Sequence, residues 1–68
     1  MQDLNKRLKA LRIEKGVTQE QMARDTGITQ AAISKWESSD TIPKLEFLVK
    51  LAKYFGCSID YLVGVVED

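Results

Sequence analysis

The sequence contains no histidine and only one cysteine, Cys57. A single cysteine cannot form an internal disulfide, and without histidine the usual ligands of a zinc ion are missing. The same absences remove the side chains that most often act as general bases or activate a nucleophile. We therefore expect no metal, no cofactor and no enzymatic activity, and we expect Cys57 to pack as a small apolar side chain.

Proline and glycine are scarce, with one and four residues, which suits helices better than the turns of a sheet. No apolar run is long enough for a membrane span or a signal peptide, so we expect a cytoplasmic protein without a membrane partner. The 44% hydrophobic and 29% charged content is typical of a globular domain. We assign residues 1–68 to one all-α domain.

Net charge is absent as well, because ten basic and ten acidic residues cancel. DNA-binding domains are usually basic, so the balance argues against strong non-specific binding to nucleic acid. The charge is unevenly spread, since residues 1–15 carry five basic and two acidic residues. A neutral chain can still present a basic edge to DNA, and we expect modest, salt-sensitive affinity.

Residues 18–37 hold two short helix signals separated by Gly27. Thr18 can cap the first helix, with Gln21 three residues later to complete a capping box. Gly27 can take the left-handed conformation that ends this helix, and Thr29 can cap the next one. Two helices joined by so short a turn cross steeply, which predicts a helix-turn-helix unit. Its second helix projects outward, where it can enter a groove of DNA.

This second helix has two distinct faces. At about 100° per residue, Ala32, Ile33 and Trp36 lie on one side, and we expect Trp36 to pack in the core rather than stack on a nucleotide. The opposite side carries an amide, a methyl group, a hydroxyl and one cation: Gln30, Ala31, Ser34 and Lys35. These groups suit the edges of bases in a major groove. An ordinary polar surface helix is the alternative interpretation.

The remaining periodicities predict three more helices. Leu4, Leu8 and Leu11 indicate an amphipathic helix over residues 3–15. The two central helices fall near 19–25 and 30–37. A fourth helix ends at Gly56, and Ser58 can cap a short fifth one. The apolar run of the fourth helix consists of Leu45, Leu48, Leu51, Ala52 and Phe55. We therefore expect a compact bundle of five helices.

The chain resembles the phage-repressor-like helix-turn-helix family, which includes lambda repressor, Cro and the bacterial XRE-type regulators. The resemblance covers roughly residues 4–64, and it depends on the order and spacing of many elements rather than on any single one. The matching residues are Leu11, Arg12, Thr18, Gln19, Met22, Ala23, Gly27, Thr29, Gln30, Ile33, Trp36, Glu37, Pro43, Leu48, Leu51, Ala52, Gly56 and the run from Ser58 through Leu62.

The resemblance implies roles for several residues. Arg12 and Glu37 match a pair that joins the first helix to the end of the recognition helix, so we expect a partly buried ion pair. Gln19 matches a glutamine that touches a phosphate and braces the recognition-helix glutamine, here Gln30. Thr29 and Lys44 are the further candidates for phosphate contacts. Asp40 departs from the basic loop that is common in relatives and puts the backbone contacts of that loop in doubt.

We therefore expect a sequence-specific regulator of transcription, a repressor that binds a pseudo-palindromic operator in double-stranded DNA as a homodimer. Two alternatives stay open: the antitoxin of a toxin–antitoxin pair, with a toxin or antagonist as protein partner, and a protein-interaction module that has lost DNA binding. Apolar residues near the carboxyl end, off the expected core stripe, predict the dimer interface: Phe47, Tyr54, Tyr61, Val63, Val65 and Val66.

Overall fold

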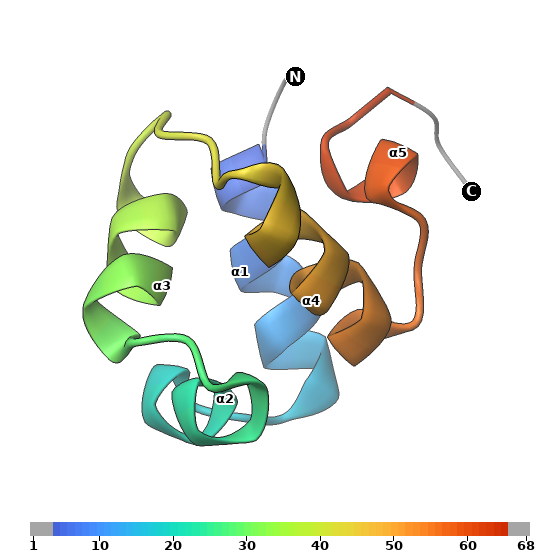
Figure 1. The fold of residues 1–68 in the computed structure, drawn as a ribbon. Coiled ribbons are helices and arrows are strands. Elements are labelled where there is room, and N and C mark those ends of the chain that lie inside the picture. The colour runs from blue at the N-terminus through green and yellow to red at the C-terminus, as the bar shows by residue number, and fades with distance from the viewer. Residues whose placement is uncertain (1–3, 66–68) are drawn as a thin grey trace.

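The computed structural model describes residues 4–65, and within this range all regular structure is helical. The helices are α1 (Leu4–Lys15), α2 (Gln19–Thr26), α3 (Gln30–Ser38), α4 (Leu45–Phe55) and α5 (Ile59–Leu62). Figure 1 shows α2 and α3 next to each other, with α4 passing in front of α1 and α5 on the side away from α3. The all-α, five-helix prediction is confirmed. None of these helices is long and apolar enough to cross a membrane.

The helix boundaries follow from short local signals. Three hydroxyl side chains accept a hydrogen bond from the backbone N–H three residues ahead: Thr18, Thr29 and Ser58, at 3.0, 3.2 and 3.0 Å. Gly27 and Gly56 follow α2 and α4 with φ of 76° and 67°, a left-handed conformation that costs a side-chain-bearing residue energy. These are the caps and stops that the sequence predicts.

Every helix contributes one completely buried side chain to a shared core. These side chains, each 0% exposed, are Leu8, Met22, Ile33, Leu51 and Leu62. Trp36 is only 6% exposed and packs in the same cluster, as the sequence predicts. Cys57 is partly buried against this cluster. Removing any one of the five central side chains would leave a cavity that costs about 2–5 kcal/mol.

Two local predictions are wrong. Gln21 does not complete a capping box: its side-chain oxygen accepts a hydrogen bond from Arg24 at 3.0 Å rather than from the backbone N–H of Thr18, and its amide nitrogen donates to Asp25 at 2.7 Å. Leu45 is not in the core: it is 68% exposed, although its angle around α4 matches the buried stripe. As the first residue of α4 it lies almost one turn before Leu48, the first buried residue of that helix.

Candidate nucleic-acid interface

Helix α3 is anchored through its inward face and leaves its outward face free. Ile33 and Trp36 are buried, and the Trp36 ring lies 5.4 Å from the ring of Phe47. The outward residues Gln30, Ala31, Ser34 and Lys35 are all exposed. Within residues 4–65 their side chains make no hydrogen bond or ion pair. Their polar atoms are therefore available to an external surface.

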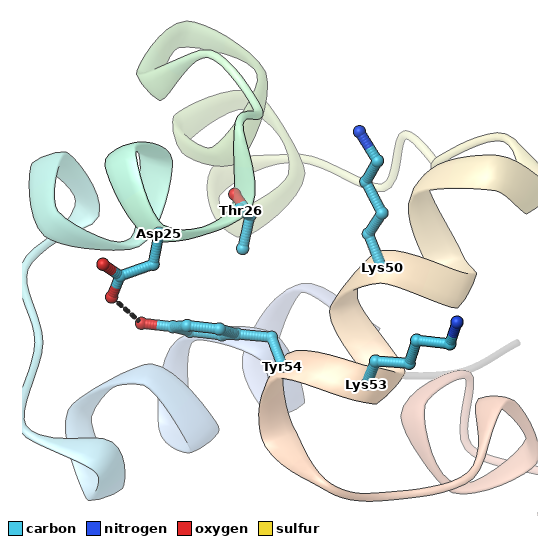
Figure 2. A pocket seen from close by; sticks show the side chains of 5 residues that line it. All are labelled: Asp25, Thr26, Lys50, Lys53 and Tyr54. Atoms are coloured by element: carbon cyan, nitrogen blue, oxygen red, sulfur yellow. Dashed lines mark hydrogen bonds between the residues drawn. The ribbon is translucent and has the colours of Figure 1, made fainter.

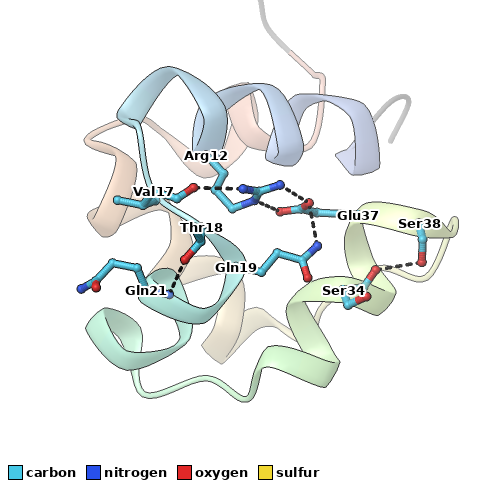
Figure 3. Close-up of polar contacts among 8 residues, drawn as sticks. All are labelled: Arg12, Val17, Thr18, Gln19, Gln21, Ser34, Glu37 and Ser38. Carbon is cyan, nitrogen blue, oxygen red and sulfur yellow. Dashed lines mark hydrogen bonds and ion pairs between the residues drawn. The ribbon is translucent and has the colours of Figure 1, made fainter.

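A buried ion pair fixes the end of α3 against α1. Arg12 Nε donates to Glu37 Oε2 at 2.8 Å, and Arg12 Nη2 donates to Glu37 Oε1 at 3.1 Å (Figure 3). The side chains are only 13% and 3% exposed. The hydrogen bond with Glu37 raises the pKa of Arg12 above its ordinary value. This is the pair expected from the sequence, and its two parallel hydrogen bonds set the orientation of α3.

The same network reaches the loop that precedes α2. Arg12 Nη1 donates to the carbonyl oxygen of Val17 at 2.9 Å, next to the cap residue Thr18. Gln19 Nε2 donates to Glu37 Oε1 at 3.1 Å. One carboxylate therefore holds the end of α1, the start of α2 and the end of α3 together, as Figure 3 shows. Sequence reasoning identified the pair but missed these two further contacts.

The expected contact between Gln19 and Gln30 is not present in the structure. The amide nitrogen of Gln19 is instead directed to the buried carboxylate of Glu37, which offers a charged acceptor. Gln30 is exposed and makes no side-chain hydrogen bond among the described residues. The bracing role predicted for Gln19 is therefore directed at the end of α3 rather than at its first residue.

Each of the three candidates for phosphate contacts lies at the amino end of a helix. Gln19 is the first residue of α2, Thr29 caps α3, and Lys44 precedes α4. Helix amino ends favour anions, because unpaired N–H groups and the helix dipole both point there. Lys44 is exposed and forms no ion pair within residues 4–65, so its ammonium group is available to a phosphate. Asp40, exposed in the preceding loop, adds an opposing negative charge.

Two serines stabilise the carboxyl end of α3. Ser38 donates its hydroxyl to the carbonyl of Ser34 at 2.8 Å, and Ser39 donates to the carbonyl of Lys35 at 2.7 Å. Each hydroxyl thus bonds to the carbonyl group one turn earlier, near the carboxyl end of the helix. The sequence predicts this helix near 30–37, and the structure extends it by one residue to Ser38.

The residues predicted for a dimer interface differ in their exposure. Val63 is 5% exposed and part of the core, so the prediction that it extends beyond the last helix as an unburied residue is wrong. It follows Leu62 directly, and the chain turns at Gly64 with φ of 83°. Val65 is 65% exposed. Val66 lies outside the described residues.

The three aromatic residues of that set are partly buried within the chain itself. Phe47 packs against Trp36. The Tyr54 hydroxyl donates to Asp25 Oδ2 at 2.7 Å. The Arg7 guanidinium carbon lies 4.5 Å from the centroid of the Tyr61 ring, and Arg7 also donates to the Tyr61 carbonyl. Each of these rings therefore already has intramolecular contacts, and only part of its surface remains for a partner.

The helix-turn-helix family matches residues 8–62, which include α2, α3 and α4. The chain belongs to this family. Its similarity to curated proteins agrees with that assignment, whereas no solved structure matched it.

The similar curated proteins are named as regulators of transcription. The transcriptional activator BcrR of Enterococcus faecalis is 41% identical over 65 residues, covering 96% of this chain and 32% of that protein. The repressor protein C2 of Salmonella phage P22 is 37% identical over 88% of this chain and 28% of that protein. The phage CTXphi repressor RstR of Vibrio cholerae is 34% identical over 90% of this chain and 55% of that protein. The chain thus spans about a third to a half of these relatives, whose names describe regulators and not enzymes.

Proposed function

We propose that this chain is a sequence-specific DNA-binding regulator of transcription that acts as a repressor. The observation that carries the proposal is the exposed face of α3, where the side chains of Gln30, Ser34 and Lys35 make no hydrogen bond or ion pair with any residue from 4 to 65. Further support comes from the family and from the phage repressors among the relatives. Binding over a promoter would exclude polymerase from it.

The contacts with DNA divide into two groups. In the major groove, the Gln30 amide pairs with adenine, the Lys35 ammonium group with guanine, and the Ala31 methyl group packs on a thymine methyl, with the Ser34 hydroxyl beside them. Gln19, Thr29 and Lys44 contact the phosphates and orient α3. The buried carboxylate of Glu37 keeps both groups in register, because it bonds to α1 and α2 from the end of α3.

Operator binding by single variants tests this division. Gln30→Ala and Lys35→Ala should each weaken binding by about 1–3 kcal/mol and relax specificity at one base position. Lys44→Ala should weaken binding to all sequences alike and reduce the dependence of affinity on salt. Lys53→Ala, at an exposed lysine near the carboxyl end of α4, is the matched control. Equal effects of all four variants would contradict the assignment of α3 to the bases.

We further propose that two copies bind one pseudo-palindromic operator, with recognition helices about 34 Å apart. The contact surface comprises the exposed Val65, the residues after it that include Val66, and the accessible parts of Tyr61, Tyr54 and Phe47. So small an interface predicts a weak dimer that DNA strengthens.

Analytical ultracentrifugation tests this assembly. The protein should show a monomer–dimer equilibrium that Tyr61→Asp shifts to monomer, whereas Lys9→Ala leaves it unchanged. A protein that stays monomeric at high concentration and binds its operator one copy at a time would rule out the dimer.

A further inference from the structure

A shallow pocket of about 330 Å³ lies between the end of α2 and the side of α4. Its lining, drawn in Figure 2, consists of Asp25, Thr26, Lys50, Lys53 and Tyr54. The proposed phosphate contacts are at the amino ends of α2, α3 and α4, whereas these residues belong to the later turns of α2 and α4. Lys53 follows Lys44 by nine residues, which corresponds to about 13 Å along the axis of α4 at a rise of about 1.5 Å per residue. The pocket therefore shares no residue with the proposed DNA contacts.

The positive charges of this pocket are unmatched. Lys50 and Lys53 are exposed, and neither forms an ion pair or a hydrogen bond within the part of the chain that the structure describes. Three residues apart on one helix, they are neighbours on its surface. Two adjacent ammonium groups repel each other and are stabilised by an anion placed near both.

The carboxylate of the pocket is already engaged. Asp25 accepts hydrogen bonds from the Tyr54 hydroxyl and from the Gln21 amide, both at 2.7 Å. These bonds, with smaller contributions from the charges of Lys15 and Arg24, hold its pKa below the ordinary value. Asp25 forms no ion pair with Lys50 or Lys53 within the described residues, so an anion can still bind next to these two lysines.

The ring of Tyr54 is held in place before any ligand arrives. Its hydroxyl is bonded to Asp25, Lys15 Nζ lies 4.7 Å from the ring centroid, and the Phe55 ring packs against it edge-on at 5.1 Å. Figure 2 shows this ring along one side of the pocket, with Thr26 across from it. A ring that is already ordered loses little entropy when a second planar group stacks on it.

From these contacts we propose that the pocket binds a small aromatic anion, a ring that bears a phosphate monoester or a carboxylate. The anionic group binds near Lys50 and Lys53, and the ring stacks on Tyr54. Such a ligand contacts both α2 and α4 and lies beside Thr26, one residue before the turn of the helix-turn-helix. The site shares no residue with the proposed base and phosphate contacts, and Tyr54 alone is shared with the proposed dimer surface, so the pocket and the DNA contacts can fail separately.

Amide chemical shifts of the full chain test this site without DNA. Titration with phenyl phosphate should give saturable shifts at Thr26, Lys50, Lys53 and Tyr54, and inorganic phosphate should bind more weakly because it has no ring. Sodium chloride at matched ionic strength should give no saturable shift. The double variant Lys50→Ala/Lys53→Ala should bind phenyl phosphate about tenfold more weakly, since two exposed ion pairs are lost. The matched control Lys6→Ala/Lys9→Ala should bind like the parent chain.

Tyr54→Phe separates the ring from its hydroxyl and should retain the preference for phenyl phosphate over inorganic phosphate. Shifts that follow ionic strength alone, or saturable binding that survives in the lysine double variant, would overturn the proposal.

Discussion

Helix α2 is joined to the rest of the molecule by a polar contact at each end, and the two contacts differ in burial. At its start, Gln19 bonds to the Arg12–Glu37 pair, whose side chains are 13% and 3% exposed. At its end, the exposed Asp25 accepts a hydrogen bond from the Tyr54 hydroxyl. A charge that loses its partner in a buried site stays desolvated and unmatched, whereas water replaces a lost partner at the surface. Similar hydrogen-bond lengths thus correspond to very different contributions to stability.

The largest effect should come from Glu37→Ala. This change leaves Arg12 buried without its carboxylate and frees Gln19, so the free energy of unfolding should fall by about 3 kcal/mol. Thermal melting followed by circular dichroism should show a midpoint lower by about 10 °C or more. Glu20→Ala is the control, because Glu20 pairs with Arg24 at 3.8 Å with both side chains more than half exposed. An unchanged midpoint for Glu37→Ala would show that the buried pair does not stabilise the fold.

A smaller effect should follow Arg12→Lys. Lysine keeps the positive charge but cannot donate the two parallel hydrogen bonds to Glu37 or the third bond to Val17. We expect a loss of about 1–2 kcal/mol, between that of Glu37→Ala and zero. Urea unfolding measures it. If the free energy of unfolding fell as much as for Glu37→Ala, the geometry of the guanidinium hydrogen bonds would matter as much as the charge.

The smallest effect on stability should come from the exposed contact between Tyr54 and Asp25 at the end of α2, and it should depend on pH. Partial burial and the hydrogen bond to Asp25 raise the pKa of Tyr54 to about 12, against about 10 in an unfolded chain. Because the folded state favours the protonated phenol, this stabilisation is complete below pH 10 and is lost as the pH rises toward 12. Urea unfolding at pH 9, 10 and 11 should show the difference between the parent chain and Tyr54→Phe shrinking. A constant difference would contradict this assignment.

The sequence was a good guide to features that depend on neighbouring residues. Thr18, Thr29 and Ser58 cap helices, and Gly27 and Gly56 end them, because each of these signals acts within one turn. The inward position of Trp36 followed from helical periodicity. The Arg12–Glu37 pair is 25 residues apart, and only the family resemblance indicated it.

Features that depend on packing between distant segments were missed. Tyr54 and Asp25 are 29 residues apart, and neither residue carries a local signal for the other. Val63 follows a helix of only four residues, too short to show a periodicity, so its burial could not be inferred from spacing. Gln19 and Gln21 have flexible side chains that can reach several partners. In the structure they donate to the carboxylates of Glu37 and Asp25, respectively.

The central claim is that the exposed face of α3 recognises a base sequence in DNA. Selection from random-sequence duplexes at low salt tests it most directly. We predict that the protein enriches one motif with two related half-sites, and that Gln30→Ala and Lys35→Ala change the enriched bases at separate positions. Failure to enrich any motif would contradict the claim and favour a protein-interaction module on the same fold.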